Sequence, residues 1–180
     1  MAKLVAKTYS EALFEVAIEQ DQLDLIHAEL GAVSDIFEEN ADFFEVFRTP
    51  KINKEERKAI IEEVFSKTVS QEVMNFLKIL IDKKRGSAIH GIRREFDRMV
   101  NEHKGIVKAI VESAVELTET EQERLKAELA RTTGKTILLS NKINPEVVGG
   151  LVIRIGDKVI DGSVRSRLAT LKDSLAQIIV

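Results

Sequence analysis

The chain has 180 residues, of which 44% are apolar and 32% are charged, and its formal net charge is −3. This composition is typical of one ordinary globular domain or two small ones, and it excludes a disordered chain, a fibrous repeat and a strongly basic nucleic-acid packing protein. Cysteine is absent, which excludes disulfides, thiol catalysis and cysteine-ligated zinc. No apolar run approaches the ~18 residues that a membrane-spanning helix needs, and the first residues lack the apolar core of a signal peptide.

Charge and glycine are unevenly distributed along the chain. Residues 1–47 carry a net charge of −9, residues 48–104 a net charge of +5, and residues 105–180 a net charge of +1. Three glycines precede residue 105 and six lie from Gly105 onward. This change in composition predicts a boundary at Gly105 between two domains, residues 1–104 and residues 105–180.

Apolar residues recur at steps of three and four through the first 104 residues, and this spacing predicts helices. Breaks are expected at Gln20-Asp21, Asn40, Pro50 and Gly86-Ser87. Asn53, with Glu56 three residues later, is typical of a capping box, and Ser70 is a suitable N-cap for the next helix. The expected fold of this domain is a six-helix bundle with its apolar stripes facing inward.

From Gly105 onward the pattern changes to that of a small α/β domain. A run of β-branched residues starting at Ile106 predicts a strand. Thr118, with Glu121 three residues later, is a capping box that begins a helix, and Gly134 is expected to end it.

Three further strands and a last helix complete the predicted order β-α-β-β-β-α. The strands are expected at residues 137–139, 151–155 and 158–160, with Gly156-Asp157 as a tight turn between the last two. The helix follows Ser163 and carries apolar residues at positions 164, 168, 171, 175 and 178. The whole chain is therefore predicted to be an α+β protein of two domains.

No recognisable catalytic constellation appears in the sequence. Gly134-Lys135-Thr136 matches the end of a phosphate-binding loop, but Leu129 stands where that loop needs its first glycine, and the order helix, loop, strand is reversed. A glycine C-cap is the favoured interpretation. His27, His90 and His103 show no metal-ligand spacing. We predict no catalytic residue, no metal site and no cofactor, and we favour an interaction protein over an enzyme.

Three groups of basic residues have alternative interpretations. Lys83-Lys84-Arg85 ends a predicted helix, where cations suit the negative end of the macrodipole. Arg93, Arg94 and Arg98 are candidates for binding nucleic acid, but few aromatics accompany them, which favours a solvated face that partners the acidic first block. Arg165 and Arg167 lie in the first turn of the last helix, where they oppose the macrodipole. These two arginines either extend into water or meet an acidic partner, and both interpretations stay open.

Two segments resemble a known protein family. Residues 8–17, Thr-Tyr-Ser-Glu-Ala-Leu-Phe-Glu-Val-Ala, are similar to the opening helix of the delta subunit of the proton-translocating ATP synthase, the family of the oligomycin-sensitivity-conferring protein. Residues 149–168, Gly-Gly-Leu-Val-Ile-Arg-Ile-Gly-Asp-Lys-Val-Ile-Asp-Gly-Ser-Val-Arg-Ser-Arg-Leu, resemble that family's C-terminal signature along their whole length. The second segment is the more specific, because it fixes glycines, charges and apolar positions over about twenty residues.

The resemblance implies a non-catalytic stator subunit of an ATP synthase, and a sequence that begins directly with the first helix favours a bacterial protein over an organellar precursor. In the family the N-terminal six-helix bundle binds the alpha/beta head, and the C-terminal α/β domain binds the peripheral-stalk b subunits, so that the head does not rotate during proton-driven ATP synthesis. The implied partners are the N-terminal segments of the alpha subunits, the beta subunits and the b subunits. Nucleic acid is not among them, and the chain would reach the cytoplasmic face of the cell membrane only through the complex. The alternatives are a helical adaptor outside the synthase and a nucleic-acid-binding protein.

The resemblance also implies where the partners dock. The family's alpha-binding groove, between the first and fifth helices, corresponds to Tyr9, Ala12, Leu13, Val16, Val73, Leu77 and Leu80. Each of these apolar residues has an equally weighted alternative as ordinary bundle core. The b subunits are expected on the last helix, at Arg165, Arg167, Leu168, Leu171 and Leu175. A structural role is expected for Gly150, Gly156, Asp161, Gly162 and Ser163, in which the glycines permit turns and the oxygen side chains cap the helix.

Overall fold

The structure is a computed structural model that describes residues 2–156 and 158–168. The chain divides into two compact units, Met1–Val100 and Asn101–Val180. The predicted α+β class is confirmed, since the first unit is helical and the second contains a four-stranded sheet. The division lies slightly before Gly105 because Val100 is the last residue of its helix that is buried in the first core.

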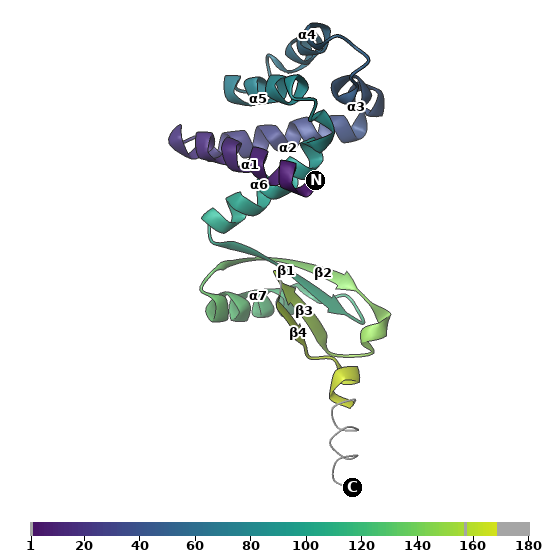
Figure 1. The fold of residues 1–180 in the computed structure, drawn as a ribbon. Coiled ribbons are helices and arrows are strands. Elements are labelled where there is room, and N and C mark those ends of the chain that lie inside the picture. Colours follow the sequence, from purple (N-terminus) through teal and green to yellow (C-terminus); the bar gives the residue numbers. More distant parts are fainter. Residues whose placement is uncertain (1, 157, 169–180) are drawn as a thin grey trace. The chain divides into compact units, whose positions relative to one another are not determined.

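The first unit is built from helices joined by short turns (Figure 1). In chain order they are α1 (Ala2–Glu19), α2 (Leu23–Glu39), α3 (Ala41–Arg48), α4 (Lys54–Phe65), α5 (Gln71–Asp82), the 3-10 turn η1 (Gly86–Ala88) and α6 (Ile89–His103). Ser70 caps α5 as predicted, with its Oγ accepting from the backbone N–H of Val73 at 3.4 Å. Asn53 caps α4, but its side chain accepts from the N–H of Glu55 instead of Glu56, so the predicted capping-box bond is not the one formed.

A cluster of phenylalanines holds the second, third and fourth helices together. Phe37 of α2 stacks on Phe47 of α3 with 4.7 Å between ring centroids, and Phe65 of α4 meets Phe37 edge-on at 5.8 Å. Phe43 and Phe44 of α3 pack around the same ring. Aromatic pairs of this kind contribute about 0.5–1.5 kcal/mol each beyond their burial. Phe37 therefore lies at the centre of the ring contacts that join α2, α3 and α4.

The second unit follows the predicted order of elements. They are β1 (Ile106–Ser113), α7 (Glu119–Thr133), β2 (Thr136–Ile143), the 3-10 turn η2 (Pro145–Val147), β3 (Leu151–Ile155) and β4 (Lys158–Asp161). Residues 164–168 are helical, and the remainder of the predicted last helix lies outside the described residues. The capping box of Thr118 and Glu121 is present, and Gly134 ends α7 in the left-handed conformation with φ 66°. Both features were predicted.

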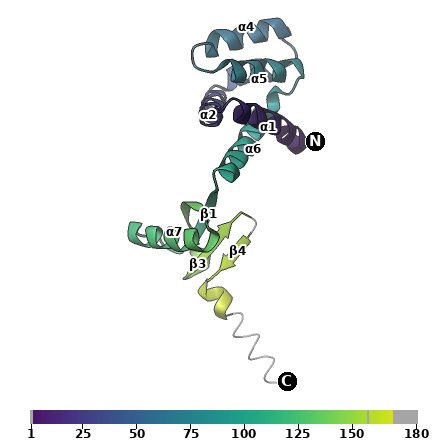
Figure 2. The ribbon, with the colours of Figure 1, turned by 90° about the vertical axis from the view of Figure 1, so that its left-hand side faces the viewer.

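The sheet has the order β2-β1-β3-β4. β1 and β2 are parallel and are connected through α7, while β3 pairs antiparallel with both β1 and β4. α7 lies on one face of the sheet, and its Leu129 packs with the inward-facing Ala109, Val111, Ile137 and Ile153 (Figure 2). Because successive strand residues point to opposite faces, Ile110, which lies between Ala109 and Val111, points to the other face and is exposed.

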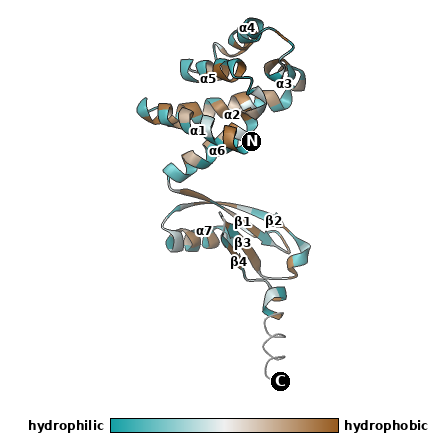
Figure 3. Ribbon diagram, in the orientation of Figure 1, coloured by the Kyte–Doolittle hydropathy of each residue, from teal (hydrophilic) through white to brown (hydrophobic). Residues whose placement is uncertain are grey.

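Hydrophobic and hydrophilic residues alternate around the helices and along the strands (Figure 3). The colouring shows apolar residues on several helices of the first unit, α1 and α5 among them. Within residues 2–156 and 158–168, none of the helices is long and apolar enough to span a membrane.

Candidate partner-binding surfaces

α1 and α5 lie beside each other in the first unit (Figures 1 and 2), and exposed apolar residues flank their contact. The Tyr9 ring of α1 contacts the Phe76 ring of α5 edge-on, with 6.4 Å between centroids. Ala12 and Val16 follow Tyr9 at steps of three and four residues, and Ile79 follows Phe76 at a step of three, so each set shares one side of its helix. Val16 is 36% exposed and Ile79 is 47% exposed. We call Tyr9, Ala12, Val16 and Ile79, together with the buried Phe76 that Tyr9 contacts, the α1–α5 strip.

The other residues predicted for this surface point into the bundle. Leu13, Val73, Leu77 and Leu80 are buried in the core of the first unit. They support the α1–α5 strip from inside, whereas Tyr9 is half-buried and Ala12 and Val16 are exposed. Ile79 was not predicted from the sequence. The one sign of it in the sequence is that Ile79 is apolar on a side of α5 that is otherwise polar. Asn75 and Gln71 lie on that side, four and eight residues before it.

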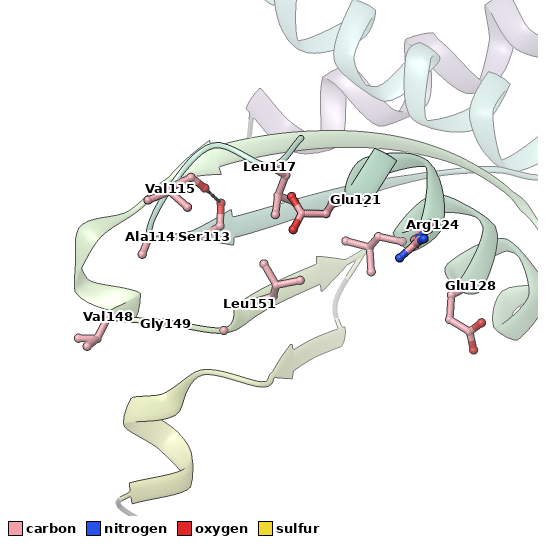
Figure 4. A pocket seen from close by; sticks show the side chains of 12 residues that line it. Ser113, Ala114, Val115, Leu117, Glu121, Arg124, Glu128, Val148, Gly149 and Leu151 are labelled. Atoms are coloured by element: carbon pink, nitrogen blue, oxygen red, sulfur yellow. Dashed lines mark hydrogen bonds between the residues drawn. The ribbon is translucent and has the colours of Figure 1, made fainter. Parts of the chain in front are cut away.

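A second candidate surface is an open pocket of about 770 Å³ in the second unit (Figure 4). It lies between the end of β1, the first turns of α7 and the segment that leads into β3. Leu117 and Leu151 face the space from opposite sides, and Glu121, Arg124 and Glu128 lie along α7. An apolar pocket with a charged rim of this kind suits the apolar side chains of a protein partner.

Two exposed valines flank this pocket. Val115 and Val148 are each 72% exposed. Val148 has φ 61° and ψ −40°, which a β-branched residue adopts only at a cost of roughly 1–3 kcal/mol. Its position is held by η2, since the Val148 N–H donates to the carbonyl of Pro145 at 3.2 Å. The pocket thus presents apolar side chains to solvent on a strained turn, and neither valine was predicted as a binding residue.

Two of the glycines predicted to be structural, Gly150 and Gly162, lie where two backbone segments cross. Gly150 has φ 80°, and a Cβ on it would lie 2.5 Å from the carbonyl oxygen of Gly162. Gly162 in turn donates its N–H to the carbonyl of Leu151 at 2.9 Å. Gly156, at the turn between β3 and β4, has φ 56°. Gly150 therefore allows the strand after the pocket to pass directly against the segment that begins the last helix.

Asp161 and Ser163 form the start of that helix. The Asp161 carboxylate accepts from the backbone N–H of Ser163 at 2.9 Å, and the Ser163 hydroxyl accepts from the N–H of Ser166 at 3.2 Å. The backbone N–H of Ser163 holds the pKa of Asp161 below its usual range. The Val164 N–H donates to the carbonyl of Gly149 at 2.9 Å, so the helix begins at the edge of the pocket.

The residues predicted to meet the peripheral stalk are only partly described. Arg165 and Arg167 are exposed, and Leu168 is 61% exposed. Leu171 and Leu175 lie outside the described residues, so their part of the prediction stays a prediction.

Two of the histidines, His27 and His90, and the α6 arginine Arg93 form ion pairs or hydrogen bonds within the first unit. His27 Nε2 lies 2.7 Å from a carboxylate oxygen of Asp97, and His90 Nδ1 lies 2.9 Å from the Ser34 hydroxyl. Arg93 pairs with Asp35 of the acidic first block, as the solvated-face interpretation expects. Within residues 2–156 and 158–168, no group of three or more His, Asp or Glu residues is arranged to hold a metal ion.

An exposed apolar strip on the helical unit and an apolar pocket on the α/β unit are the kinds of surface at which proteins bind other proteins. Residues 5–175 match the family model described as "ATP synthase delta (OSCP) subunit". The chain belongs to this family.

Individual relatives agree over the full length. The chain is 46% identical to the ATP synthase subunit delta of Lachnoclostridium phytofermentans over 179 residues, which cover 99% of this chain and 98% of the relative. It is 39% identical over 180 residues to the subunit of the same name from Alkaliphilus oremlandii, with 100% of both chains covered. Its fold resembles a chain in the Toxoplasma gondii mitochondrial ATP synthase hexamer with a TM-score of 0.70 and 22% identity, over 95% of this chain and 97% of that one.

Proposed function

We propose that this chain is the stator subunit that links the catalytic head of an ATP synthase to its peripheral stalk and resists rotation of the head during proton-driven ATP synthesis. The observation that carries this function is the match to the delta (OSCP) family over residues 5–175. The role is structural and non-catalytic: the chain transmits torque through two binding surfaces. It reaches the cytoplasmic face of a bacterial membrane through the complex.

The first unit binds the head, and the α1–α5 strip holds amphipathic N-terminal segments of the alpha subunits. A partner helix places apolar residues at steps of three and four, and the strip offers Val16 and Ile79 on either side of the Tyr9–Phe76 contact. Tyr9 supplies an apolar ring together with a hydroxyl, which suits the edge of such a contact. The beta subunits are neighbours in the same head.

The second unit binds the b subunits of the peripheral stalk. Two observations support this placement: the apolar pocket flanked by Val115 and Val148, and the exposed Leu168 on the helix that starts at the pocket's edge. Arg165 and Arg167 would meet carboxylates of the stalk, so this contact is expected to weaken as salt rises.

Binding of an alpha-subunit N-terminal peptide to the full chain tests the first assignment. Tyr9→Asp and Ile79→Asp each place a carboxylate in the strip, and we expect each to weaken the affinity measured by calorimetry at least about tenfold, because a desolvated charge is left without a partner. Leu25→Asp is the matched control, since Leu25 is 49% exposed on α2 and lies outside the strip. Equal affinities for all three variants and the unaltered chain would remove the strip as the docking site.

A reconstitution tests the stator function itself. Membranes carrying the proton channel and the stalk are combined with heads that lack this subunit, and proton-driven ATP synthesis is measured with and without the chain. The stator role requires that the chain restores synthesis. Restoration by the second unit alone would contradict the assignment of head binding to the first unit.

A further inference from the structure

Arg57 of α4 is a buried cation with few compensating contacts. The residue is 2% exposed, and its guanidinium donates a hydrogen bond from Nη1 to the carbonyl of Phe47 at 3.2 Å. The buried Nε has no hydrogen-bond partner, and Arg57 forms no ion pair within residues 2–156 and 158–168. A buried charge normally has a carboxylate partner and several hydrogen bonds, because burial removes its hydration. An apolar residue of similar size at this position is therefore expected to make the fold more stable.

The helices next to Arg57 carry carboxylates that pair with other cations. Four such carboxylates lie on α3, α4 and α5: Glu45 pairs with Arg48, Glu55 and Asp82 pair with Lys58, and Glu62 pairs with Lys78. None of the four contacts Arg57, although the planar fork of an arginine suits a carboxylate better than a single carbonyl. The bundle thus leaves this guanidinium without the partner that its chemistry favours.

The hydrogen bond to Phe47 places the Arg57 guanidinium at the end of α3. The Phe47 carbonyl belongs to the last turn of α3, where backbone oxygens lack intrahelical partners and carry partial negative charge. The first residue of η1 reaches the same point, since a Cβ on Gly86 would lie 3.1 Å from this oxygen and 3.2 Å from Cα of Arg48. Three elements therefore meet here, and we call Phe47, Arg57 and Gly86 the Phe47 junction.

Further cations lie around the Phe47 junction. Arg48 and Arg85 are exposed, and each is next in sequence to a residue of the junction. Lys54, one turn before the buried arginine on α4, donates from Nζ to the carbonyl of Asp82 at 3.2 Å, which joins the start of α4 to the end of α5. Arg85 forms no ion pair in the part of the chain that the structure describes. These exposed charges attract an anion toward the junction over roughly 10 Å at 0.1 M salt.

We propose that Arg57 is a latent ion-pair partner that binds a carboxylate side chain of the catalytic head when the first unit docks. This inference rests on the proposed head-binding function. The guanidinium exchanges its bond to the Phe47 carbonyl for a two-pronged contact with the carboxylate, and its long side chain turns toward the surface without moving α4. The partner is an acidic protein surface at the Phe47 junction, a different place from the α1–α5 strip. Because docking relieves the unfavourable burial of the charge, Arg57 favours the bound state.

Arg57→Met in the full chain separates binding from folding, since methionine keeps an unbranched side chain and removes the charge. We expect the midpoint of thermal unfolding to rise by roughly 2–5 °C, because the uncompensated buried charge is gone. We expect the affinity for purified heads that lack this subunit to fall about tenfold, because the ion pair is lost. A residue that only held the end of α3 would lower the midpoint when replaced. Arg94→Met removes the same charge at an exposed site on α6 and should leave both measurements unchanged.

Two further measurements test the chemistry of the contact. Arg57→Lys keeps the charge but loses the planar fork, so it should bind heads more tightly than Arg57→Met and more weakly than the unaltered chain. Heads whose surface carboxylates have been converted to amides with carbodiimide and glycinamide should bind the unaltered chain less tightly. The loss on amidation should be about tenfold smaller for Arg57→Met, because this variant has no guanidinium to pair with the carboxylate.

The outcomes distinguish this inference from the proposed function. The role of Arg57 is overturned if Arg57→Met binds heads as tightly as the unaltered chain, if its thermal midpoint falls, or if amidation weakens both chains equally. Failure of the unaltered chain to associate with untreated heads would instead remove the proposed function. A free oxyanion is the competing partner. If about 20 mM inorganic phosphate raised the midpoint of the unaltered chain but not that of Arg57→Met, and both bound heads equally, the guanidinium would be assigned to phosphate and not to the head.

Discussion

At the scale of single residues, the residues that stabilise the fold differ from those proposed to bind a partner. Glycine and short polar side chains shape the backbone of the second unit, as at Gly150 and Ser163, and these roles could be predicted from their order in the sequence. The contact of Gly150 with Gly162 could not be predicted, because it depends on how β3 and the start of the last helix cross in space. Likewise Val148 gives no sign in the sequence that its backbone adopts a positive φ.

Gly150→Ala is expected to destabilise the second unit by about 2–4 kcal/mol. The added Cβ would lie 2.5 Å from the carbonyl of Gly162, and the residue would also keep φ 80°. Gly105→Ala is the matched control, because Gly105 has φ 63° but nothing within 4 Å of a Cβ, so only the backbone cost of about 1 kcal/mol remains. Chemical denaturation measures the free energy of unfolding of both variants. Equal losses would mean that the backbone at Gly162 moves away from the added Cβ at no further cost.

At the scale of elements, local patterns determined which helices and strands form, and long-range contacts determined how they pair. The β-branched run after Gly105 and the capping box of Thr118 predict a strand and a helix, and both form. The sheet order β2-β1-β3-β4 rests on pairing between distant residues and was not predictable from periodicity.

The same limit applies to the α1–α5 strip. An apolar stripe identifies which side of a helix is apolar, but it does not show which edge stays uncovered once neighbours pack. Val73, Leu77 and Leu80 lie at the centre of the α5 stripe and are buried, whereas Ile79 lies at its margin and is exposed.

Glu112 joins three segments of the second unit and makes its stability depend on pH. Its carboxylate accepts from Asn144 Nδ2 at 2.8 Å and lies 3.5 Å from Arg154 Nε of β3, and these contacts, the Asn144 bond first, lower its pKa. A carboxyl whose folded-state pKa is lowered stabilises the fold above its unfolded pKa, and that contribution is lost as pH falls through the folded value. The second unit should therefore lose stability below about pH 4.5.

Glu112→Gln is expected to lower the thermal midpoint at neutral pH and to flatten part of its decline in acid, because the variant has no carboxyl to protonate. Glu116→Gln, an exposed residue on the segment after β1, is the control and should leave the pH profile in place. The midpoint is followed by circular dichroism from neutral pH into the acid range. A profile for Glu112→Gln that parallels the unaltered chain would show that the Asn144 and Arg154 contacts do not carry this linkage.

At the scale of the whole molecule, the two proposed binding surfaces belong to units with separate cores. Among the residues that the structure describes, the first core draws on residues between Ala6 and Val100, and the second on residues between Val107 and Ile155. A protein that joins a head to a stalk needs both surfaces at once, since each contact alone leaves the other partner free to turn. The change of composition at Gly105 predicts a division at that residue, because a helical bundle and a strand-containing unit need different residues, whereas the compact units divide after Val100.

Separating the two units should separate folding from stator function. A fragment of residues 1–104 retains α1 to α6 and the complete first core, so we expect it to be helical by circular dichroism and to bind purified heads with near-native affinity. It should nevertheless fail to restore proton-driven ATP synthesis, and it should inhibit restoration by the full chain, because it occupies the head without reaching the stalk. An unfolded fragment would show that the second unit is required for the bundle to form. A folded fragment that restores synthesis would show that the stalk contact also lies in the first unit, and the pocket beside Val148 would then need another partner.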